Sequence, residues 1–229
     1  MKLYSAPLSL FAKKVEIALA EKGLAFERVL VAFSQTTGYA PKHKDVVAAN
    51  PKAQVPVLID ADVTLYDSTV ILEYLEDAYP MPPLYPAGAA LRADCRLLEL
   101  YADEIMLAEV RQLMHRTAPR PFDPARWIDL ESKAEGAEAT LAEQFADLER
   151  RLGPSPYFFD ALSVADIALF VTIHYSLRLG GPGIGDFARL AAWYRRLLER
   201  PAFASVVADI AAADAELSAP VANAFRGAR

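Results

Sequence analysis

The first 80 residues combine short apolar runs, typical of strands, with segments in which apolar residues recur at helical spacing. Met1–Ser5 and Phe26–Val31 are the first two short runs, and we expect both to be strands. Between them, steps of four, three and one mark one helical face: Phe11, Val15, Ala18 and Leu19. The opposite face holds the charged residues Lys13, Lys14, Glu16, Glu21 and Lys22. Gly23 stands where a C-terminal cap belongs, so this is a strand–helix–strand unit, normally parallel.

Two further apolar runs, Val55–Ile59 and Val63–Tyr66, are separated only by Asp60-Ala61-Asp62. Such a short, turn-rich connection predicts an antiparallel hairpin. Ser68–Tyr79 then shows helical spacing. The sequence therefore predicts β-α-β, a connecting segment and β-β-α, which make a small mixed sheet with helices on its faces.

The chain changes character near residue 80, where Tyr79–Pro86 holds four prolines in eight residues. Proline fixes φ and removes a donor, so this segment predicts an extended linker. Beyond it we expect an antiparallel bundle of helices that covers Leu91–Ile105, Leu130–Leu152, Val164–Tyr175, Phe187–Glu199 and Ala202–Ala215. Val164–Tyr175 is apolar on nearly every side, which is typical of a buried central helix. We predict an α/β N-terminal domain over residues 1–80 and an all-α domain over residues 88–229.

Composition excludes several classes of protein. The 24 Lys and Arg against 30 Asp and Glu give a net charge of −6, and no basic block is present, so we expect no nucleic-acid partner. Apolar stretches such as Ile167–Val171 are too short to span a membrane. One cysteine, Cys95, excludes a disulfide framework, and with three histidines it argues against a zinc site. We expect a cytoplasmic protein without a metal.

Three short segments hold groups suited to binding chemistry. Ser9 precedes the first helix and is either an N-cap or a hydroxyl that donates to an anion at the helix N-terminus. Pro56 enters a strand, so Val55–Pro56 is either an edge position or a cis bond that would turn the backbone of Val55 toward a peptide-like ligand. Asp67 and Ser68 open a helix and are either its cap or a site for a group carrying an ammonium and a carboxylate.

A fourth segment, Ser163-Val164-Ala165-Asp166, has the pattern of a capping box. The buried helix that follows needs its end groups satisfied. We therefore interpret Asp166 as a folding residue rather than a catalyst.

These motifs together resemble the cytosolic glutathione transferases of the serine type over essentially the whole chain. The resemblance is carried by Leu3-Tyr4-Ser5 with Ser9, Asn50-Pro51 with Gln54–Leu58, Tyr66-Asp67-Ser68, the proline linker, Leu162–Asp166, and Leu190–Tyr194 with Arg200–Phe203. It implies a thioredoxin-like domain that binds glutathione beside an all-helical domain that shapes the second-substrate pocket.

The resemblance also implies roles for individual residues. Ser9 matches the catalytic serine of the zeta, tau and phi classes, with Ser5 in reserve. Val55, across a cis Pro56, would pair with the cysteinyl part of glutathione, and Asp67 with Ser68 would hold the γ-glutamyl group. Lys42, and less strongly Gln54, would lie near the glycyl carboxylate, although Lys42 is equally well interpreted as a solvated loop lysine. Candidates for the second pocket are Leu8, Phe11, Arg111, His115 and Tyr175, with the tail around Phe225 folding over it.

The implied activity is conjugation or transfer of glutathione to a hydrophobic electrophile, as in detoxification, by a homodimer. Two alternatives stay open. One is a non-catalytic or stress-related protein that binds glutathione or another ligand with the same fold. The other is a bacterial β-aryl etherase that uses glutathione, which the segments Pro41–Asp45 and Val55–Pro86 resemble. The fold does not decide among these, because function resides in sites grafted on folds.

Overall fold

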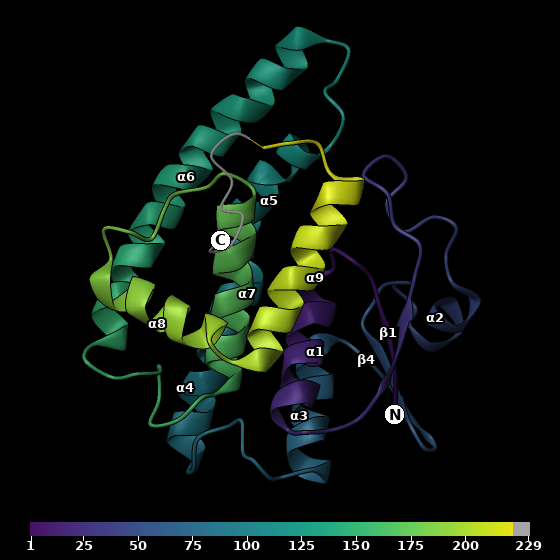
Figure 1. Ribbon diagram of the computed structural model, residues 1–229, viewed down its shortest axis with the longest axis vertical. Helices are drawn as coiled ribbons and strands as arrows, with labels where there is room; N and C mark the ends of the chain where they lie inside the picture. The colour runs from purple at the N-terminus through teal and green to yellow at the C-terminus, as the bar shows by residue number, and fades with distance from the viewer. Residues whose placement is uncertain (222–229) are drawn as a thin grey trace. The chain divides into compact units, whose positions relative to one another are not determined.

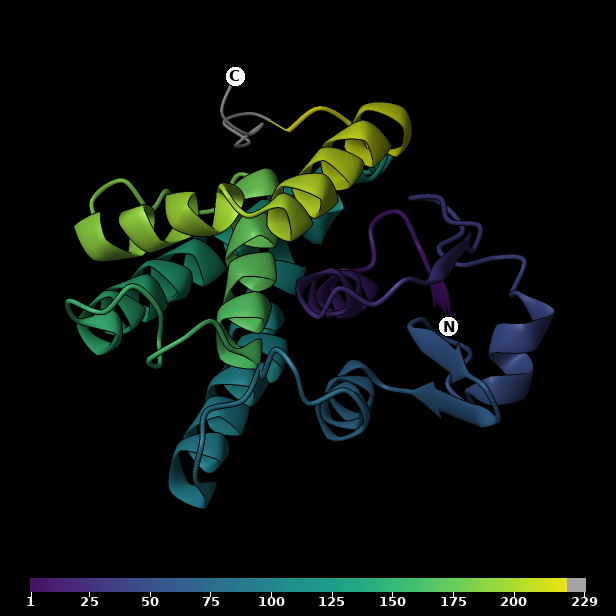
Figure 2. The same ribbon diagram turned by 60° about the horizontal axis from the view of Figure 1, so that its bottom comes forward.

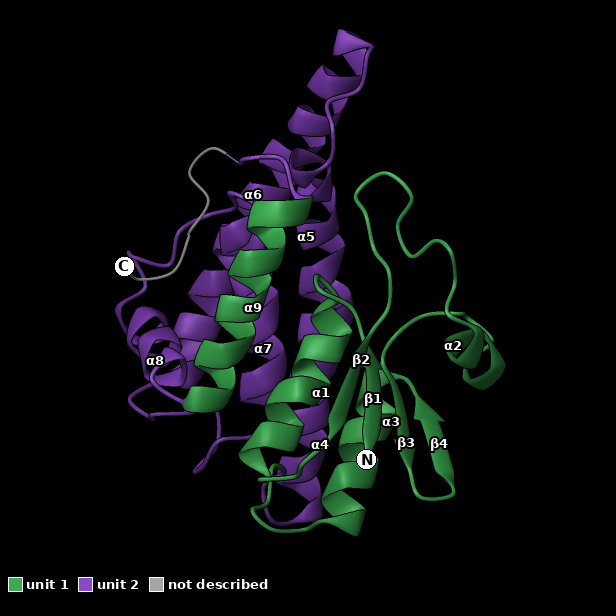
Figure 3. Cartoon of the chain, turned by 45° about the vertical axis from the view of Figure 1, so that its right-hand side comes forward, with its two compact units in different colours: residues 1–84, 201–217 green, residues 85–200, 218–229 purple. Residues whose placement is uncertain are grey.

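The computed structural model describes residues 1–221, which divide into two compact units (Figure 3). Unit 1 comprises Met1–Leu84 and Pro201–Leu217, and unit 2 comprises Tyr85–Arg200 with the residues from Ser218 onwards. The break after Leu84 falls within the proline linker. The division expected from sequence, however, placed residues 88–229 in one domain, whereas the last helix, α9 (Pro201–Leu217), belongs to unit 1 because it packs against the first helix.

Unit 1 is built on a four-stranded mixed sheet in the order β2-β1-β3-β4. Its strands are β1 (Lys2–Ser5), β2 (Glu27–Leu30), β3 (Val57–Asp60) and β4 (Val63–Tyr66). β1 pairs in parallel with β2 and antiparallel with β3, and β3 forms the predicted hairpin with β4. The N-terminal segment of unit 1 that holds these strands also forms three helices: α1 (Leu10–Glu21), α2 (Lys44–Ala49) and α3 (Ser68–Ala78). The predicted mixed sheet is confirmed, and α2 is an addition within the connecting segment.

The register of the strands sends alternate side chains to two cores. Leu3 faces Leu58 across the ladder, and both pack with apolar residues of α1 and α3. Tyr4 faces Val57, and both pack with Val46 of α2 on the other side. Figure 2 shows α1 and α3 on one side of the sheet and α2 on the other. Period-two alternation therefore gives this sheet two buried faces.

Both faces of α1 are buried, although the sequence pattern divides it into an apolar and a charged face. Lys13 and Glu16 are 1% and 4% exposed and form an ion pair at 2.9 Å. Arg28 of β2 and Asp209 of α9 bind to this pair and to each other. The charged side chains thus join three elements of unit 1, and the buried charges of Lys13 and Glu16 each have an opposite charge beside them.

Unit 2 is helical throughout its regular structure (Figure 1). Its elements are α4 (Ala89–Leu100), a π-helical segment η1 (Tyr101–Met106), α5 (Leu107–Leu113), a 3₁₀ turn η2 (Met114–Thr117), α6 (Pro124–Leu152), α7 (Val164–Arg178) and α8 (Ala188–Leu198). Every residue of α7 is buried, as its apolar pattern predicts. The capping box of Ser163 and Asp166 is present, and the indole of Trp193 donates to Asp166 at 2.9 Å. Within residues 1–221, no helix combines the length and apolar character that a membrane span needs.

Candidate functional site

Ser9 is the N-cap of α1 and is 5% exposed. Its backbone N–H donates to the carbonyl of Ala6 at 3.2 Å, and its Oγ accepts from the backbone N–H of Ala12 at 3.3 Å. The cap predicted from sequence is therefore present. The cap uses Ser9 as an acceptor, so the hydrogen of the hydroxyl still has to be donated elsewhere.

The backbone around Val55 is held in an unusual conformation. The Val55–Pro56 bond is cis, as predicted, and Val55 precedes β3 and lies outside the β-ladder. Just before it, Ala53 adopts φ +51°, a left-handed value that is uncommon outside glycine. Lys42 Nζ donates to the carbonyl of Ala53 at 3.2 Å, and the amide of Asn50 donates to the carbonyl of Gln54 at 2.7 Å. Lys42 is thus an exposed lysine that has a backbone partner in this loop.

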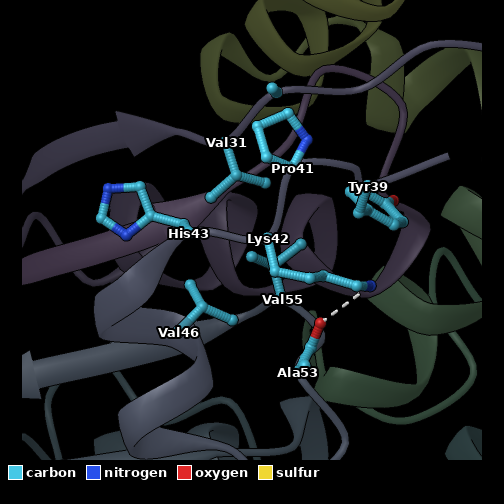
Figure 4. A pocket seen from close by; sticks show the side chains of 9 residues that line it. Val31, Tyr39, Pro41, Lys42, His43, Val46, Ala53 and Val55 are labelled. Carbon is cyan, nitrogen blue, oxygen red and sulfur yellow. Dashed lines mark hydrogen bonds between the residues drawn. The ribbon is translucent and has the colours of Figure 1, made fainter. Parts of the chain in front are cut away.

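A shallow hollow lies beside Val55 (Figure 4), with Val31, Tyr39, Lys42, His43 and Ala53 among the residues that line it. The Tyr39 ring packs against Phe33 with centroids 5.1 Å apart, and the Lys42 ammonium lies 5.6 Å from the Tyr39 ring centre. His43 caps α2 through Nδ1, which accepts from Asp45 N at 3.3 Å.

Sequence reasoning did not select Tyr39 or His43, because segment 32–43 has no periodic pattern that would mark them. Burial raises the pKa of Tyr39, and a hydrogen bond with the Ser9 hydroxyl lowers it in part. The pKa of this phenol therefore responds both to its burial and to the hydroxyl at the start of α1.

The N-terminus of α3 forms the third part of the site. Asp67 is the N-cap, with φ +76°, and its Oδ1 accepts from Thr69 N at 3.1 Å. Its carboxylate is exposed, whereas Ser68 is buried and its hydroxyl accepts from Lys14 Nζ at 3.5 Å. Of the three non-glycine residues with positive φ in the described chain, Ala53 and Asp67 lie at this candidate site. Strained backbone of this kind clusters at binding sites.

The residues expected to line a second pocket occupy different environments. In unit 1, Leu8 is buried, and Phe11 is half-buried with the Lys14 ammonium 5.9 Å from its ring centre. In unit 2, Arg111 is exposed and Tyr175 is buried beneath the guanidinium of Arg178, which lies 5.0 Å from the Tyr175 ring.

His115 is likewise engaged within unit 2: its Nε2 lies 2.7 Å from Glu131 and its Nδ1 2.9 Å from the carbonyl of Gln112. Phe225 lies outside the described residues. Among residues 1–221, no three His, Cys, Asp or Glu side chains gather as a metal site would require.

Comparison with known proteins places this chain in a family. The family model for the glutathione S-transferase N-terminal domain matches residues 3–83, and that for the C-terminal domain matches residues 112–196. Glutathione S-transferase Z2 of Arabidopsis thaliana is 30% identical over 210 residues, which are 90% of each chain. A stringent starvation protein A homologue of Coxiella burnetii is 32% identical over 160 residues, 70% of this chain and 68% of that protein. A glutathione S-transferase of Methylobacterium radiotolerans, solved with glutathione sulfonate, is 31% identical with a TM-score of 0.68, covering 90% of this chain and 93% of that one.

Proposed function

Because the chain belongs to the glutathione S-transferase family, we propose that unit 1 binds glutathione and that Ser9 activates its thiol for transfer to a hydrophobic electrophile. The observation that carries the proposal is that one unit holds three recognition groups at separate places in the chain. These are the hydroxyl at the start of α1, the backbone of Val55 outside the ladder, and the exposed carboxylate of Asp67. The M. radiotolerans relative with bound glutathione sulfonate supports the same ligand.

Each part of glutathione has a matching group. The backbone of Val55, preceding Pro56, would pair with the cysteinyl residue, because both peptide groups need partners. Asp67 would pair with the γ-glutamyl ammonium, and Ser68 with its carboxylate at the start of α3. Lys42 has two further ammonium hydrogens beside the one it gives to Ala53, so it would bind the glycyl carboxylate without leaving its loop. Gln54 is the weaker candidate for that end. Leu8 and Phe11 are the proposed apolar contacts of the electrophile on unit 1.

In this reaction, the main role of the protein is to keep the glutathione sulfur ionised. The thiol proton leaves to solvent, and the thiolate lone pair forms the new S–C bond as the electrophile accepts electrons or releases its leaving group. Ser9 takes no proton in this scheme. Its hydroxyl donates to the sulfur, and hydrogen bonds to a charged group are stronger than those to a neutral one.

A second candidate function is a stress-related binding protein of the same fold with little turnover. The similarity to the stringent starvation protein A homologue favours it. The two functions differ in what Ser9 is for, because a binding protein has no need of an ionised thiol.

We further propose a cytoplasmic homodimer. Leu97 and Leu100, three positions apart on α4, are 60% and 47% exposed, and Tyr66 and Val70 of unit 1 are also exposed. In each unit taken by itself, exposed apolar side chains of this kind are typical of protein contacts. Light scattering at micromolar concentration should give twice the chain mass of 25.1 kDa, and a mass equal to one chain would reject the dimer.

Calorimetry with glutathione, followed by a pH titration of the thiolate ultraviolet absorbance, tests the proposal. We expect saturable binding, a thiol pKa below the free value of about 8.5, and turnover on at least one electrophile of an aryl halide, epoxide and enone panel. Binding without turnover on any of them would favour the binding protein. An absence of glutathione binding would reject the proposed transferase and would leave a protein of the same fold that binds another ligand.

A further inference from the structure

We propose that Tyr4 and Asp45 position Lys42 to bind the glycyl carboxylate of glutathione, and that they thereby set the specificity of the protein for that end of the ligand. The inference rests on the proposed function, in which Lys42 is the partner of the glycyl carboxylate. Neither Tyr4 nor Asp45 is assigned a contact with the ligand. Both are positioning residues, which act through the segment that carries Lys42.

A hydrogen bond ties the sheet of unit 1 to the start of α2. The hydroxyl of Tyr4, on β1, donates to Oδ2 of Asp45 at 2.8 Å, and the two residues lie 41 positions apart in the chain. Tyr4 is 3% exposed, and β1 pairs with a strand on each side, so a well-fixed part of unit 1 holds the phenol. The hydrogen bond to Asp45 raises the pKa of Tyr4, which keeps the phenol protonated as a donor.

Asp45 is also joined to the residue that caps α2. Its backbone N–H donates to Nδ1 of His43, the N-cap, at 3.3 Å, and the ring of His43 lies against that of Tyr4 with centroids 5.1 Å apart. Tyr4 therefore contacts the beginning of α2 through its hydroxyl and through its ring. These contacts are important for the placement of α2, because Val46 is the only one of its six residues that is buried.

Lys42 comes directly before this cap, so the start of α2 determines where its backbone lies. Its side chain is exposed, and one ammonium hydrogen is donated to the carbonyl of Ala53 at 3.2 Å. Figure 4 shows the Lys42 side chain reaching Ala53 at one side of the hollow, with His43 at the other side. The lysine is thus held by Ala53 at its ammonium and, through the first turn of α2, by Tyr4 at its backbone.

A lysine held in this way is arranged for its ligand before the ligand binds. A long exposed side chain loses conformational freedom on binding, and preorganisation reduces that cost. Removing the Tyr4 hydroxyl releases the first turn of α2 from β1 at one contact, so Lys42 should meet the carboxylate less often in the right geometry. The loss should be confined to the glycyl end, because the proposed γ-glutamyl partners Asp67 and Ser68 lie at the start of α3.

Two ligands that differ only at the glycyl end test the inference. Glutathione amide has a neutral carboxamide of the same size in place of the glycyl carboxylate, so the ratio of the two affinities measures what the carboxylate contributes. By calorimetry, we expect wild type to prefer glutathione, and Tyr4→Phe, which keeps the ring, to lower that preference roughly three- to tenfold. The affinity for glutathione amide should stay nearly unchanged. A variant with a smaller fraction of folded protein would lose affinity for both ligands alike, which leaves the ratio unchanged.

A double-variant cycle shows whether Tyr4 acts through Lys42. Lys42→Met should remove most of the preference, and Tyr4→Phe in that background should change it no further. Tyr74→Phe is the matched control, since its hydroxyl donates to Asp60 at 2.9 Å elsewhere in unit 1 and its loss should leave the preference unchanged. Asp45→Asn keeps an oxygen that can accept from Tyr4 and should retain most of the preference, whereas Asp45→Ala should lower it as Tyr4→Phe does.

Several results would overturn the inference. An unchanged preference in Tyr4→Phe, or additive losses in the double variant, would reject the positioning role while the proposed transferase stands. Equal binding of glutathione and its amide by wild type would reject the role in the same way, because Lys42 would then contribute nothing to carboxylate binding. Wild type that binds neither ligand would reject the proposed transferase as well. If Tyr4→Phe folds poorly, Asp45→Ala tests the same hydrogen bond from its less buried side, and an unchanged preference there would also reject the role.

Discussion

The hydroxyl of Ser5 donates to Oε1 of Glu16 at 2.5 Å, inside the protein. Glu16 also accepts from Lys13 at 2.9 Å and from Arg28 at 3.1 Å, so Ser5 belongs to a buried charged cluster. Ser5 itself has no exposed surface. Of the two serines that the sequence offered for thiol activation, the geometry favours Ser9.

Replacing Ser9 by alanine should affect the chemistry of the thiol more than its binding. A hydrogen bond to a charged acceptor contributes roughly 1.5–3 kcal/mol, equivalent to about one to two units in the pKa of the bound thiol at 1.36 kcal/mol per unit. We expect a higher thiol pKa and slower turnover, with a similar dissociation constant. Loss of the cap itself should cost about 1 kcal/mol of stability. If the thiol of bound glutathione titrates identically in variant and wild type, Ser9 acts only as the N-cap of α1.

Asp67→Asn separates glutathione recognition from folding. Asparagine caps helices as well as aspartate does and tolerates positive φ, so the free energy of unfolding should change little. The charge that would pair with the γ-glutamyl ammonium is lost, and we expect glutathione affinity to fall roughly 10- to 100-fold. Calorimetry measures the affinity and urea denaturation the stability. If Asp67→Asn and wild type bind glutathione with equal affinity, Asp67 acts only as the N-cap of α3.

Lys22 should be important for stability. Its Nζ donates to Glu76 at 2.8 Å and to the carbonyls of Tyr79 and Pro82 at 2.8 and 2.9 Å. Lys22→Met would remove the ammonium that faces the buried Glu76 carboxylate, and we expect the free energy of unfolding, measured by urea denaturation, to fall by about 3–5 kcal/mol.

The control is the exposed pair Lys2–Glu27, whose ions lie 3.6 Å apart. Lys2→Met should cost no more than about 1 kcal/mol. If Lys22→Met and Lys2→Met lower the free energy of unfolding by similar amounts, the burial of the Lys22–Glu76 pair is not what makes it important for stability.

Gly181 and Gly183 lie in one turn of unit 2 but should respond differently to alanine. A Cβ at Gly181 would lie 2.4 Å from Ser176 Oγ and 3.0 Å from the Ser176 carbonyl oxygen, whereas one at Gly183 meets nothing within 4 Å. We expect Gly181→Ala to lower the melting temperature through a loss of roughly 1–3 kcal/mol. Gly183→Ala should be neutral or slightly stabilising. A neutral Gly181→Ala would mean that the turn shifts freely.

Glu131 should make folding depend on pH in the acid range. The hydrogen bond from Arg116, opposed in part by burial, lowers the pKa of Glu131 below its ordinary 4.5. A carboxyl with a lowered folded-state pKa adds stability above its unfolded value and loses it as the pH falls through the folded value. The stability advantage of wild type over Glu131→Gln should therefore be constant near neutrality and shrink in acid below about pH 4.5. An advantage that persists unchanged down to pH 3 would contradict this.

Most elements of unit 1 could be predicted because each leaves a local pattern. In the strands, apolar residues alternate with polar ones or form short apolar runs between turn residues. Gly23 adopts the positive φ expected after the helix that it ends. Helix α2 leaves no such pattern, because Val46 is its only buried residue. Tyr39 was missed for a related reason: its partners are set by the path of a non-periodic loop.

The burial of charge on α1 could not be predicted from α1 alone. Arg28 and Asp209 interact across 181 residues, and a partner that distant leaves no spacing in the sequence. The helical pattern therefore correctly assigns Lys13 and Glu16 to a polar face of α1. It does not show that another helix covers this face. The same long separation explains why sequence order assigned α9 to the second domain.

The position of α9 has a consequence for how the protein is made. More than a hundred residues separate Leu84 from Pro201, so a ribosome that has finished the sheet of unit 1 has yet to synthesise the helix that covers α1. At roughly 5–20 residues per second, the delay is on the order of ten seconds. During that time, Asp209 is absent from the charges that Lys13 and Arg28 bring together. Nascent chains should thus resist protease over residues 1–84 only after α9 has emerged, and a recombinant fragment that stops at Leu84 should be far less stable than the same residues in the full chain.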